Sequence, residues 1–394
     1  KINDKIIEAQ EVTAYTDLQI ELVDSDINEI KQMANRYVEM TNNLLNINQQ
    51  IQDDLNAKNS IPNLLVEIMT IIPENVQITE IENIRIGHAQ DMEHATGCTV
   101  IICENGAPAG VDVRGGGPAS RETELLRPVA DCTGIHALLL SGGSAFGLDA
   151  AGGVMEYLEE RNIGFDVGVT KVPLVCESCL FDLNVANHRI RPDKKMGYEA
   201  CIQSEQNQPA MGNVGAGTGA SVGKLGGIQT AMKSGLGMYA VQLGDLKIGA
   251  IVAVNALGDV YDYKTGKRLA GMRTNDGKDW ADSEQVLYKL YNQKKNLFHQ
   301  NTTIGAIITN AKFDKTHMNK IAAMAQNGYA RSIRPVHTTA DGDSIYALSV
   351  GEIEADLNVT GTLAAQVMAE AIKNAVLEAK PAYGLPAAQN FLSQ

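Results

Sequence analysis

HQNTTIGAII (residues 299–308) places two threonines directly before an apolar, β-branched run, a pattern typical of the start of a buried strand. Asn301 also begins an Asn-x-Thr triplet, which fits an acceptor site for N-glycosylation. A third interpretation is that the chain cleaves its own bond between Asn301 and Thr302. The residues elsewhere in the chain decide among the three.

Thr302 can act as a nucleophile without a histidine if it becomes the first residue of a chain. Its own α-amine, with an unperturbed pKa of about 7.7–8.0, then takes the hydroxyl proton. Such a terminus arises if the hydroxyl attacks the Asn301 carbonyl, the acyl group shifts from nitrogen to oxygen, and the ester is hydrolysed. The acidic turn Asp341-Gly-Asp343 offers carboxylates that can hold the ammonium and the hydroxyl. An asparagine amide can stabilise the developing oxyanion by about 3 kcal/mol.

One glycine-rich stretch suggests nucleotide binding, but its spacing does not support it. In GNVGAGTGASVGKLGG (212–227), Leu225 follows Lys224, so the hydroxyl that holds Mg²⁺ in a phosphate-binding loop is missing. Its glycines at 215, 217 and 219 alternate and do not match Gly-x-Gly-x-x-Gly. What remains is a loop that presents one lysine, Lys224.

SGGSAFG (141–147) reads as a strand, a glycine turn and a helix N-terminus, whose free N–H groups can receive an anion or a carbonyl oxygen. Gly143 and Ser144 are therefore candidate substrate-binding residues, although Ser144 is not in a Gly-x-Ser-x-Gly elbow. We interpret His337 as a structural hydrogen-bonding residue and not as a base.

The composition limits the classes of partner. The chain has 394 residues, 44% hydrophobic and 5% aromatic, which predicts a sizeable aliphatic core. Its net charge of −14 argues against nucleic acid or anionic lipid as the main partner. Cys176-Glu-Ser-Cys179 is a single pair without histidines nearby, so we favour core cysteines over a metal or redox site. No metal or other cofactor is expected.

Residues 1–77 differ from the rest of the chain, because they contain no glycine and carry 5 basic and 13 acidic residues. Between residues 27 and 55 a 3,4 spacing of mostly apolar positions predicts a helical arm, either a coiled coil or a solvated amphipathic helix. A short helix (NLLVEIMTII) and a strand (VQITEI) are expected to follow. Residues 61–81 weakly resemble the helix–strand entry of PilN-type pilus-assembly proteins.

From residue 78 onward, short Val/Ile-rich strands alternate with glycine-rich loops and helices. This pattern predicts a layered α/β domain over residues 78–394. The expected strands are CTVIIC, ALLLSGG, IGAIVAVNALGDVYDY, TTIGAIITNA and SIYALSV. The expected helices cover residues 145–162, 282–296, 315–333 and 362–380.

Eight blocks of this domain occur in the order of a known family. They are ITEIENIRIGHAQD, RGGGPASRETELLRP, SGGSAFGLDAAGGV, VPLVCESCLFDL, GNVGAGTGASVGK, GAIVAVNALGDV, NTTIGAIITNA and PVHTTADGDSIYAL. Through them the sequence resembles the DmpA-type aminopeptidases, a family that includes β-peptidyl aminopeptidases, D-aminopeptidase/esterases and nylon-oligomer hydrolases. The resemblance implies an α/β fold, a four-layer αββα sandwich of the N-terminal-nucleophile-like type, in a self-cleaving and usually oligomeric hydrolase.

The resemblance also implies roles for single residues. Thr302 takes the position of the nucleophile, and Asn301-Thr302 that of the processed bond. Phe146 stands where several members carry a tyrosine that helps to bind the reacting carbonyl, and phenylalanine lacks the hydroxyl for that hydrogen bond. Asp341 and Asp343 match the acidic residues that orient the nucleophile and its amine. Lys224 matches the active-site lysine, and Asn255 matches the asparagine that stabilises the oxyanion.

The sequence therefore predicts a self-processing N-terminal-threonine amidohydrolase or aminopeptidase that cleaves small peptides or amides through an acyl-enzyme. One alternative is an acyltransferase of the ornithine acetyltransferase type, and another is a non-catalytic assembly subunit. We expect a homo-oligomer of processed α/β heterodimers without membrane insertion. A cytoplasmic location is expected, or a periplasmic or membrane-associated one if an upstream segment is missing, because the chain begins with Lys1.

Overall fold

The computed structural model describes residues 27–28, 30–36, 38–39, 41–42, 73–289, 291 and 301–392. The chain divides into two compact units, Lys1–Ile72 and Pro73–Gln394. The described residues of the first unit are helical with exposed side chains. The rest of the predicted arm, with the short helix NLLVEIMTII, lies outside the described residues, so the coiled coil stays a prediction.

Two mixed β-sheets form the centre of the second unit, with strand orders β1-β12-β13-β16-β18-β4 and β2-β3-β6-β9-β5. The six strands of the first sheet are Glu74–Val76 (β1), Leu236–Leu243 (β12), Leu246–Asn255 (β13), Thr302–Ala311 (β16), Ser344–Ile353 (β18) and Ala109–Val113 (β4). The five strands of the second sheet are Arg85–Asp91 (β2), Thr96–Ala107 (β3), Ile135–Ser141 (β6), Val175–Cys179 (β9) and Ala119–Arg121 (β5).

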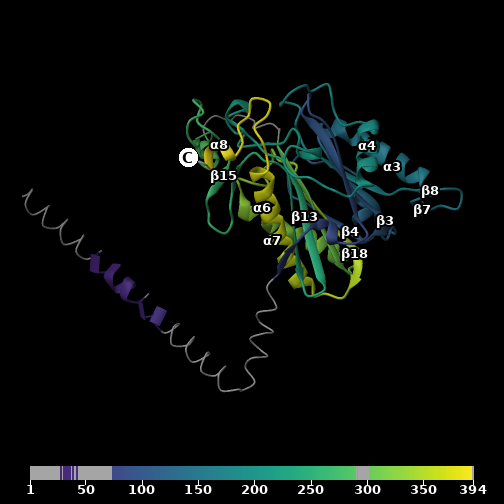
Figure 1. The fold of residues 1–394 in the computed structure, drawn as a ribbon, viewed down its shortest axis with the longest axis horizontal. Helices are drawn as coiled ribbons and strands as arrows, with labels where there is room; N and C mark the ends of the chain where they lie inside the picture. Colours follow the sequence, from purple (N-terminus) through teal and green to yellow (C-terminus); the bar gives the residue numbers. More distant parts are fainter. Residues whose placement is uncertain are drawn as a thin grey trace, which may run out of the picture. The chain divides into compact units, whose positions relative to one another are not determined.

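Helices cover the outer face of each sheet (Figure 1). α6 (Lys315–Ser332) and α7 (Leu357–Leu377) pack on the six-stranded sheet. α3 (Ala150–Glu160) and α4 (Lys194–Ser204) pack on the five-stranded sheet. The layers therefore run helix, sheet, sheet, helix, which confirms the predicted αββα sandwich.

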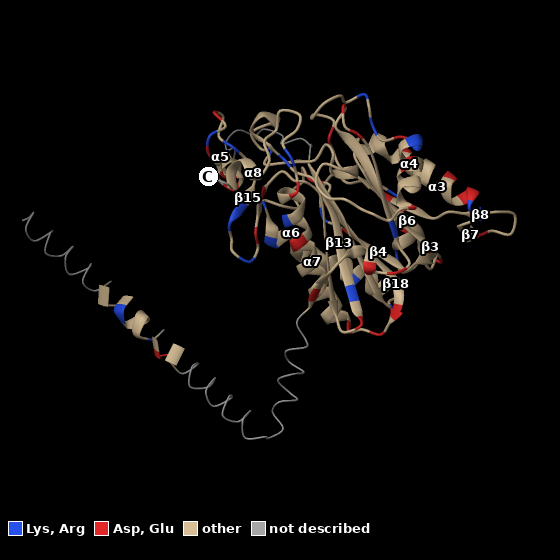
Figure 2. Ribbon diagram, viewed as in Figure 1, with Lys and Arg blue, Asp and Glu red and all other residues tan. Residues whose placement is uncertain are grey.

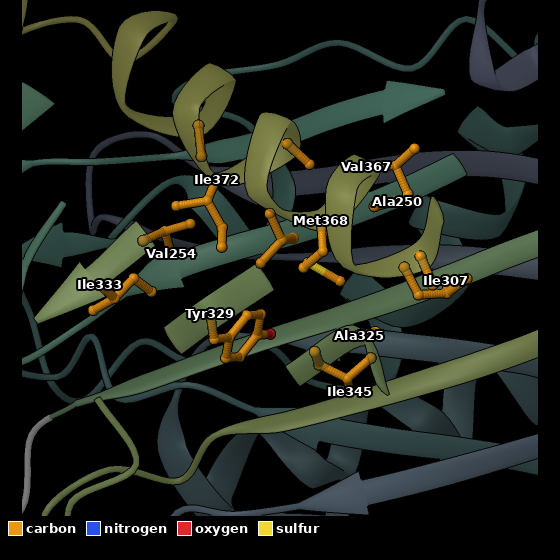
Figure 3. Close-up of a cluster of buried hydrophobic side chains, with 14 of the residues drawn as sticks. Ala250, Val254, Ile307, Ala325, Tyr329, Ile333, Ile345, Val367, Met368 and Ile372 are labelled. Carbon is orange, nitrogen blue, oxygen red and sulfur yellow. The ribbon is translucent and has the colours of Figure 1, made fainter. Parts of the chain in front are cut away.

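Three buried clusters lie between these four layers. Figure 3 shows the cluster under α6 and α7, where Tyr329 and Met368 face the strands of the six-stranded sheet. β16 contributes to two clusters, because Ile307 faces the helices and Ile304 and Ile308 face the second sheet. A strand covered on both faces reads as a continuous apolar run, which explains the sequence after Thr302.

Smaller elements complete the second unit. The short strands are β14 (Asp259–Tyr261), β15 (Arg268–Ala270) and β17 (Ile333–Arg334) in one sheet, and the pairs β10 (Ser221–Val222) with β11 (Met232–Lys233) and β7 (Phe165–Asp166) with β8 (Lys171–Val172). The short helices are α5 (Ser283–Lys289) and α8 (Gln389–Leu392), with 3₁₀ turns at Ile78–Glu80, Thr123–Leu126, Ser144–Asp149, Gly215–Gly217 and Ile228–Thr230.

Several boundaries differ from those predicted. VQITEI is not one strand, because β1 ends at Val76 and a 3₁₀ turn then buries Ile78 between the sheets. The helix expected from residue 145 begins as a 3₁₀ turn and becomes α-helical only at Ala150. α4 was not predicted; its sequence is polar and contains Gly197. A Cβ there would lie 2.0 Å from the Ala150 carbonyl oxygen, so the glycine allows α3 and α4 to pack closely.

In the part of the chain that the structure describes, no helix has the length and apolarity needed to cross a bilayer. All six cysteines are free thiols, and five of them are buried. Charged residues lie mainly on the outer helices and loops (Figure 2). A few are instead buried, and three of these, Lys224, Asp341 and Asp343, lie near the start of β16. Buried charge is unfavourable unless it is paired, so this region is the first place to look for a functional site.

Candidate active site

β16 is a central strand of the six-stranded sheet, and its start lies at the end of the sheet where three neighbouring strands present polar side chains. β16 runs antiparallel to β13 and parallel to β18, so the end of β13 and the starts of β16 and β18 meet at this end of the sheet. Asn255, the last residue of β13, is the register partner of Thr302, the first residue of β16. Asp343 directly precedes β18. The topology thus joins three of the predicted site residues.

The Thr302 hydroxyl lies against the peptide bond that precedes it. Oγ1 donates a hydrogen bond to the carbonyl oxygen of Asn301, and both residues are buried, at 4% and 6% exposure. A Cβ on Gly342 would lie 2.8 Å from Thr302 Oγ1. The turn from Asp341 to Asp343 therefore passes close to the hydroxyl, where a side chain at its middle residue would not fit.

Lys224 contacts the neighbouring asparagine from the glycine-rich loop. Its Nζ donates to the Asn255 backbone oxygen at 2.8 Å and to Oδ1 at 2.6 Å. Asn255 Oδ1 also accepts from the Ser221 N–H at 3.1 Å, and Nδ2 donates to the Phe181 carbonyl oxygen at 2.7 Å. These contacts fix the orientation of the amide, and among the described residues the second hydrogen of Nδ2 has no acceptor.

Burial decides the protonation of Lys224. Removal from water lowers the pKa of Lys224 to about 7, and this effect exceeds the opposing influence of the carboxylates at Asp341, Asp182 and Asp343. An amine with a pKa near neutrality can both accept and donate a proton at physiological pH, which an exposed lysine cannot do.

The two aspartates of the acidic turn have different partners. Asp343 Oδ1 accepts from the Thr303 N–H at 2.8 Å, and its Oδ2 accepts from His337 N at 3.1 Å and pairs with His337 Nδ1 at 3.0 Å. Asp341 Oδ2 accepts from the Thr338 N–H at 2.9 Å and from its hydroxyl at 2.6 Å. Burial and the neighbouring Asp343 carboxylate raise the pKa of Asp341 to about 6. In the uncleaved chain Asp343 thus holds the start of β16 through the backbone of Thr303.

The RGGGP segment holds the acidic turn from the other side. The N–H groups of Arg114 and Gly115 donate to the Asp343 carbonyl oxygen at 3.0 and 3.2 Å, and Gly117 N donates to the Asp341 carbonyl oxygen at 2.9 Å. A Cβ on Gly115 would lie 2.3 Å from Asp343 N, so this glycine is required by close backbone contact.

The candidate substrate-binding residues lie in the turn after β6. Gly143 and Ser144 have left-handed φ angles of 79° and 55°. Their N–H groups donate to Asp182 Oδ1 at 2.8 Å and to the Leu180 carbonyl oxygen at 2.9 Å, so both are already used within the protein. Phe146 is 60% exposed, with the Arg191 guanidinium 4.0 Å from its ring centroid. Phe146 is thus the residue of the three whose side chain is open to a ligand.

Sequence reasoning missed three contributors: Asp182, Lys233 and the contact role of Gly115. Asp182 and Lys233 are buried charged residues, at 3% and 0% exposure. Asp182 is the penultimate residue of the VPLVCESCLFDL block, and Lys233 lies in an otherwise uncharged stretch, so isolated charge among small and apolar residues was the available signal. Among the described residues, no group of three or more His, Cys, Asp or Glu has the arrangement to hold a metal ion.

Solved structures identify the fold. The chain is similar to a β-aminopeptidase of Burkholderia sp., with a TM-score of 0.54, 18% identity, and coverage of 78% of this chain and 89% of that one. It is also similar to the L-aminopeptidase D-Ala-esterase/amidase of Ochrobactrum anthropi, described as a variant of the N-terminal-nucleophile hydrolase fold. That match has a TM-score of 0.58, 16% identity, and coverage of 77% and 86%. The fold is thus that of the N-terminal-nucleophile hydrolases.

The sequence comparisons identify the family. The chain belongs to peptidase family S58, whose family model matches residues 76–389. An uncharacterized aminopeptidase of Mycobacterium leprae is 35% identical over 350 residues, which are 81% of this chain and 94% of the relative. A 6-aminohexanoate-oligomer endohydrolase of Kocuria sp. is 30% identical over 311 residues, which are 75% and 83% of the two chains. The predicted membership is confirmed, and the protein is a hydrolase, which sets aside the non-catalytic subunit.

Proposed function

We propose that the protein is a self-processing amidohydrolase that uses Thr302 as its nucleophile and acts on small peptides or amides. The observation that carries the proposal is the position of the Thr302 hydroxyl, which contacts the carbonyl of the bond to be cleaved. Membership in a peptidase family, with relatives named as an aminopeptidase and as an oligomer endohydrolase, supports the amide-cleaving chemistry.

Self-cleavage begins when Thr302 Oγ1 attacks the Asn301 carbonyl carbon. The C–N bond then breaks, the nitrogen takes a proton to become the α-amine of Thr302, and the acyl group remains on Oγ1 as an ester. Water hydrolyses the ester, which leaves a carboxylate on Asn301 and frees the hydroxyl. The α-amine does not exist before cleavage, so another group must accept the hydroxyl proton. With a pKa of about 7, Lys224 is the group we assign to this step.

In the processed enzyme the α-amine takes over as the base. Thr302 Oγ1 attacks the substrate carbonyl, and the second hydrogen of Asn255 Nδ2 stabilises the oxyanion. The leaving amine takes the proton from the α-ammonium, and water then hydrolyses the ester. Asp343 keeps Thr303, and with it the new N-terminus, in register. Phe146 supplies an apolar surface next to Arg191 for the substrate.

Replacement of the two adjacent threonines tests the proposal. Thr302→Val removes the nucleophile, so the purified chain should stay in one piece and be inactive. Thr303→Val is the matched control, because Thr303 is buried and its Oγ1 has no hydrogen-bond partner among the described residues. Intact mass and N-terminal sequencing should show a fragment that begins Thr-Thr-Ile-Gly in the wild type and Thr-Val-Ile-Gly in the control. A wild-type chain that remains whole after long incubation at neutral pH would refute self-processing.

Acyl transfer to an amine would use the same acyl-enzyme and differ only in its second step. The peptidase match favours water as the acceptor. Product analysis with and without an added amino acid separates the two, because a transferase forms a new amide only with the amine present.

A homo-oligomer of processed chains and a cytoplasmic location remain predictions. Light scattering of the processed protein measures the first. Fractionation of cells that express the full-length gene product measures the second.

A further inference from the structure

Asp182 lies at the point where both glycine-rich loops of the sequence meet. From this position we infer that Asp182 is a positioning residue, which clamps the two loops together and supplies the negative charge that balances the Lys224 amine. The inference rests on the proposed role of Lys224 and Thr302. It concerns a residue outside the set that the sequence predicted, and it explains why the two loops need their glycines.

The first loop follows β6 and is held by the Asp182 carboxylate. Oδ1 accepts from the Gly143 N–H at 2.8 Å, and Oδ2 accepts from the Thr96 hydroxyl at 2.7 Å. A Cβ on Gly142 would lie 2.1 Å from Oδ2, so the backbone closes directly on the carboxylate. The Asp182 carboxylate thus fixes the backbone conformation of the loop that carries Phe146.

The second loop packs against the other side of the same residue. A Cβ on Gly219 would lie 2.6 Å from Asp182 Cβ. Two residues further on, the Ser221 N–H donates to Asn255 Oδ1 at 3.1 Å. The residue before Asp182, Phe181, accepts from Asn255 Nδ2 at 2.7 Å. Asp182 and its neighbour therefore connect both loops to the asparagine that contacts Lys224.

The buried side chain of Lys233 binds backbone carbonyl groups of the second loop. Its Nζ donates to the Gly217 and Ala220 carbonyl oxygens at 3.0 Å each and to the Ser234 carbonyl oxygen. Burial lowers the pKa of Lys233 to about 7, and the Asp182 carboxylate opposes that decrease. The glycine-rich loop thus surrounds a lysine side chain, which accounts for its resemblance to a phosphate-binding loop without phosphate chemistry.

The charges around the two amines determine the expected pH effect. Lys224 faces the carboxylates of Asp341, Asp182 and Asp343, and the last of these also pairs with His337. Asp182 faces Lys224 and Lys233. Burial raises the pKa of Asp182 to about 6. Its carboxylate is therefore largely ionised at neutral pH, where it favours protonated Lys224.

Asp182→Asn keeps the size of the side chain and removes its charge. Precursor made by cell-free translation is shifted to a series of pH values, and the fragment that begins with Thr302 is quantified over time. We expect processing to slow by on the order of tenfold, because the loops and Asn255 lose their fixed position. We also expect the acidic limb of the pH–rate profile to move to lower pH, because a Lys224 without this neighbouring charge loses its proton more easily.

Glu370→Gln is the control for loss of a buried carboxylate away from the site. Glu370 is 7% exposed on α7 and pairs with Lys264, so its loss affects folding stability without changing the charge near Lys224. The acidic limb of the pH–rate profile of Glu370→Gln should lie at the same pH as that of the wild type. If Asp182→Asn slows processing without moving that limb, or leaves both rate and limb unchanged, the inference is overturned.

Thr96→Val serves if Asp182→Asn does not fold. It removes the hydroxyl donor to Oδ2, keeps the carboxylate, and should slow processing severalfold. Processing at the wild-type rate would show that Asp182 does not hold the two loops together. The wild-type chain separates this inference from the proposed function. If the wild type does not split, the proposed function fails, whereas equal splitting of wild type and Asp182→Asn removes only the role of Asp182.

Discussion

The two ends of β16 each have a lysine nearby, and the two lysines are in opposite environments. Near the Thr302 end, Lys224 is 7% exposed and donates to Asn255. Directly after the other end, Lys312 has a side chain that is 59% exposed and pairs with Glu352 at 2.7 Å. Burial lowers the pKa of Lys224 to about 7, whereas the hydrogen bond to Glu352 raises the pKa of Lys312.

The difference shows how one residue type serves two purposes in the same sheet. The exposed pair at Lys312 is screened by water and contributes little to stability. The buried amine at Lys224 is held close to its titration midpoint at neutral pH, and the structure around it keeps it there. Position relative to solvent, and not residue identity, decides which lysine can take part in proton transfer.

The largest effect is expected from exchanging each lysine for methionine, which keeps the stem and removes the amine. Lys224→Met should slow self-processing by roughly a thousandfold, because the group assigned to accept the Thr302 proton and to hold Asn255 is lost. Lys312→Met should process at the wild-type rate. Time courses of fragment appearance at one pH measure both. Equal rates for the two variants would remove Lys224 from the mechanism.

A smaller effect, on the order of a hundredfold, is expected from an added methyl group near the nucleophile. Gly342→Ala places a Cβ 2.8 Å from Thr302 Oγ1 and 2.8 Å from the Gly117 carbonyl oxygen, so the hydroxyl or the acidic turn must move. Gly117→Ala is the matched control, because its Cβ would meet only the Asp341 carbonyl oxygen, at an ordinary 3.8 Å. Processing rate and thermal unfolding of both variants separate a displaced hydroxyl from a general loss of stability.

The sequence allowed the layers and the chemical residues to be predicted, for different reasons. Continuous apolar runs such as that of β16 predicted strands buried on both faces, and the resemblance supplied their order. Asn255, Thr302 and Asp343 were named without any knowledge of their distances. The register of β13 with β16 and the parallel pairing of β16 with β18 then explain why these residues meet.

What the sequence did not reveal depends on contacts between distant segments. No helix was predicted over residues 194–204, and Gly197 lies within α4 where it packs on the Ala150 carbonyl. The N–H groups of Gly143 and Ser144 looked available for a ligand, but Asp182 and Leu180 accept from them. No local pattern marks Asp182 as the partner of a loop that lies 39 residues earlier in the chain.

The smallest expected effect is on the pH dependence of stability, measured in chains that carry Thr302→Val so that they remain whole. The folded-state pKa of Lys224, about 7, lies below the ordinary value of 10.5. Between these values the unfolded chain binds a proton that the folded chain does not, so the free energy of unfolding rises with pH across this window.

Lys224→Met removes that contribution. Its stability advantage over the parent should therefore be greatest near pH 7 and shrink toward pH 10.5, by about 1.4 kcal/mol per unit of pKa difference. Lys233 is present in both chains, and the carboxyl groups of Asp182 and Asp341, with pKa values of about 6, titrate below this window. The folded-state pKa of Lys312 is raised, so Lys312 is protonated in both the folded and the unfolded chain over this window. Lys312→Met should therefore show no such trend in urea denaturation. A constant difference between Lys224→Met and its parent would mean that Lys224 keeps its proton in the folded chain, and its role as the proton acceptor would then fail.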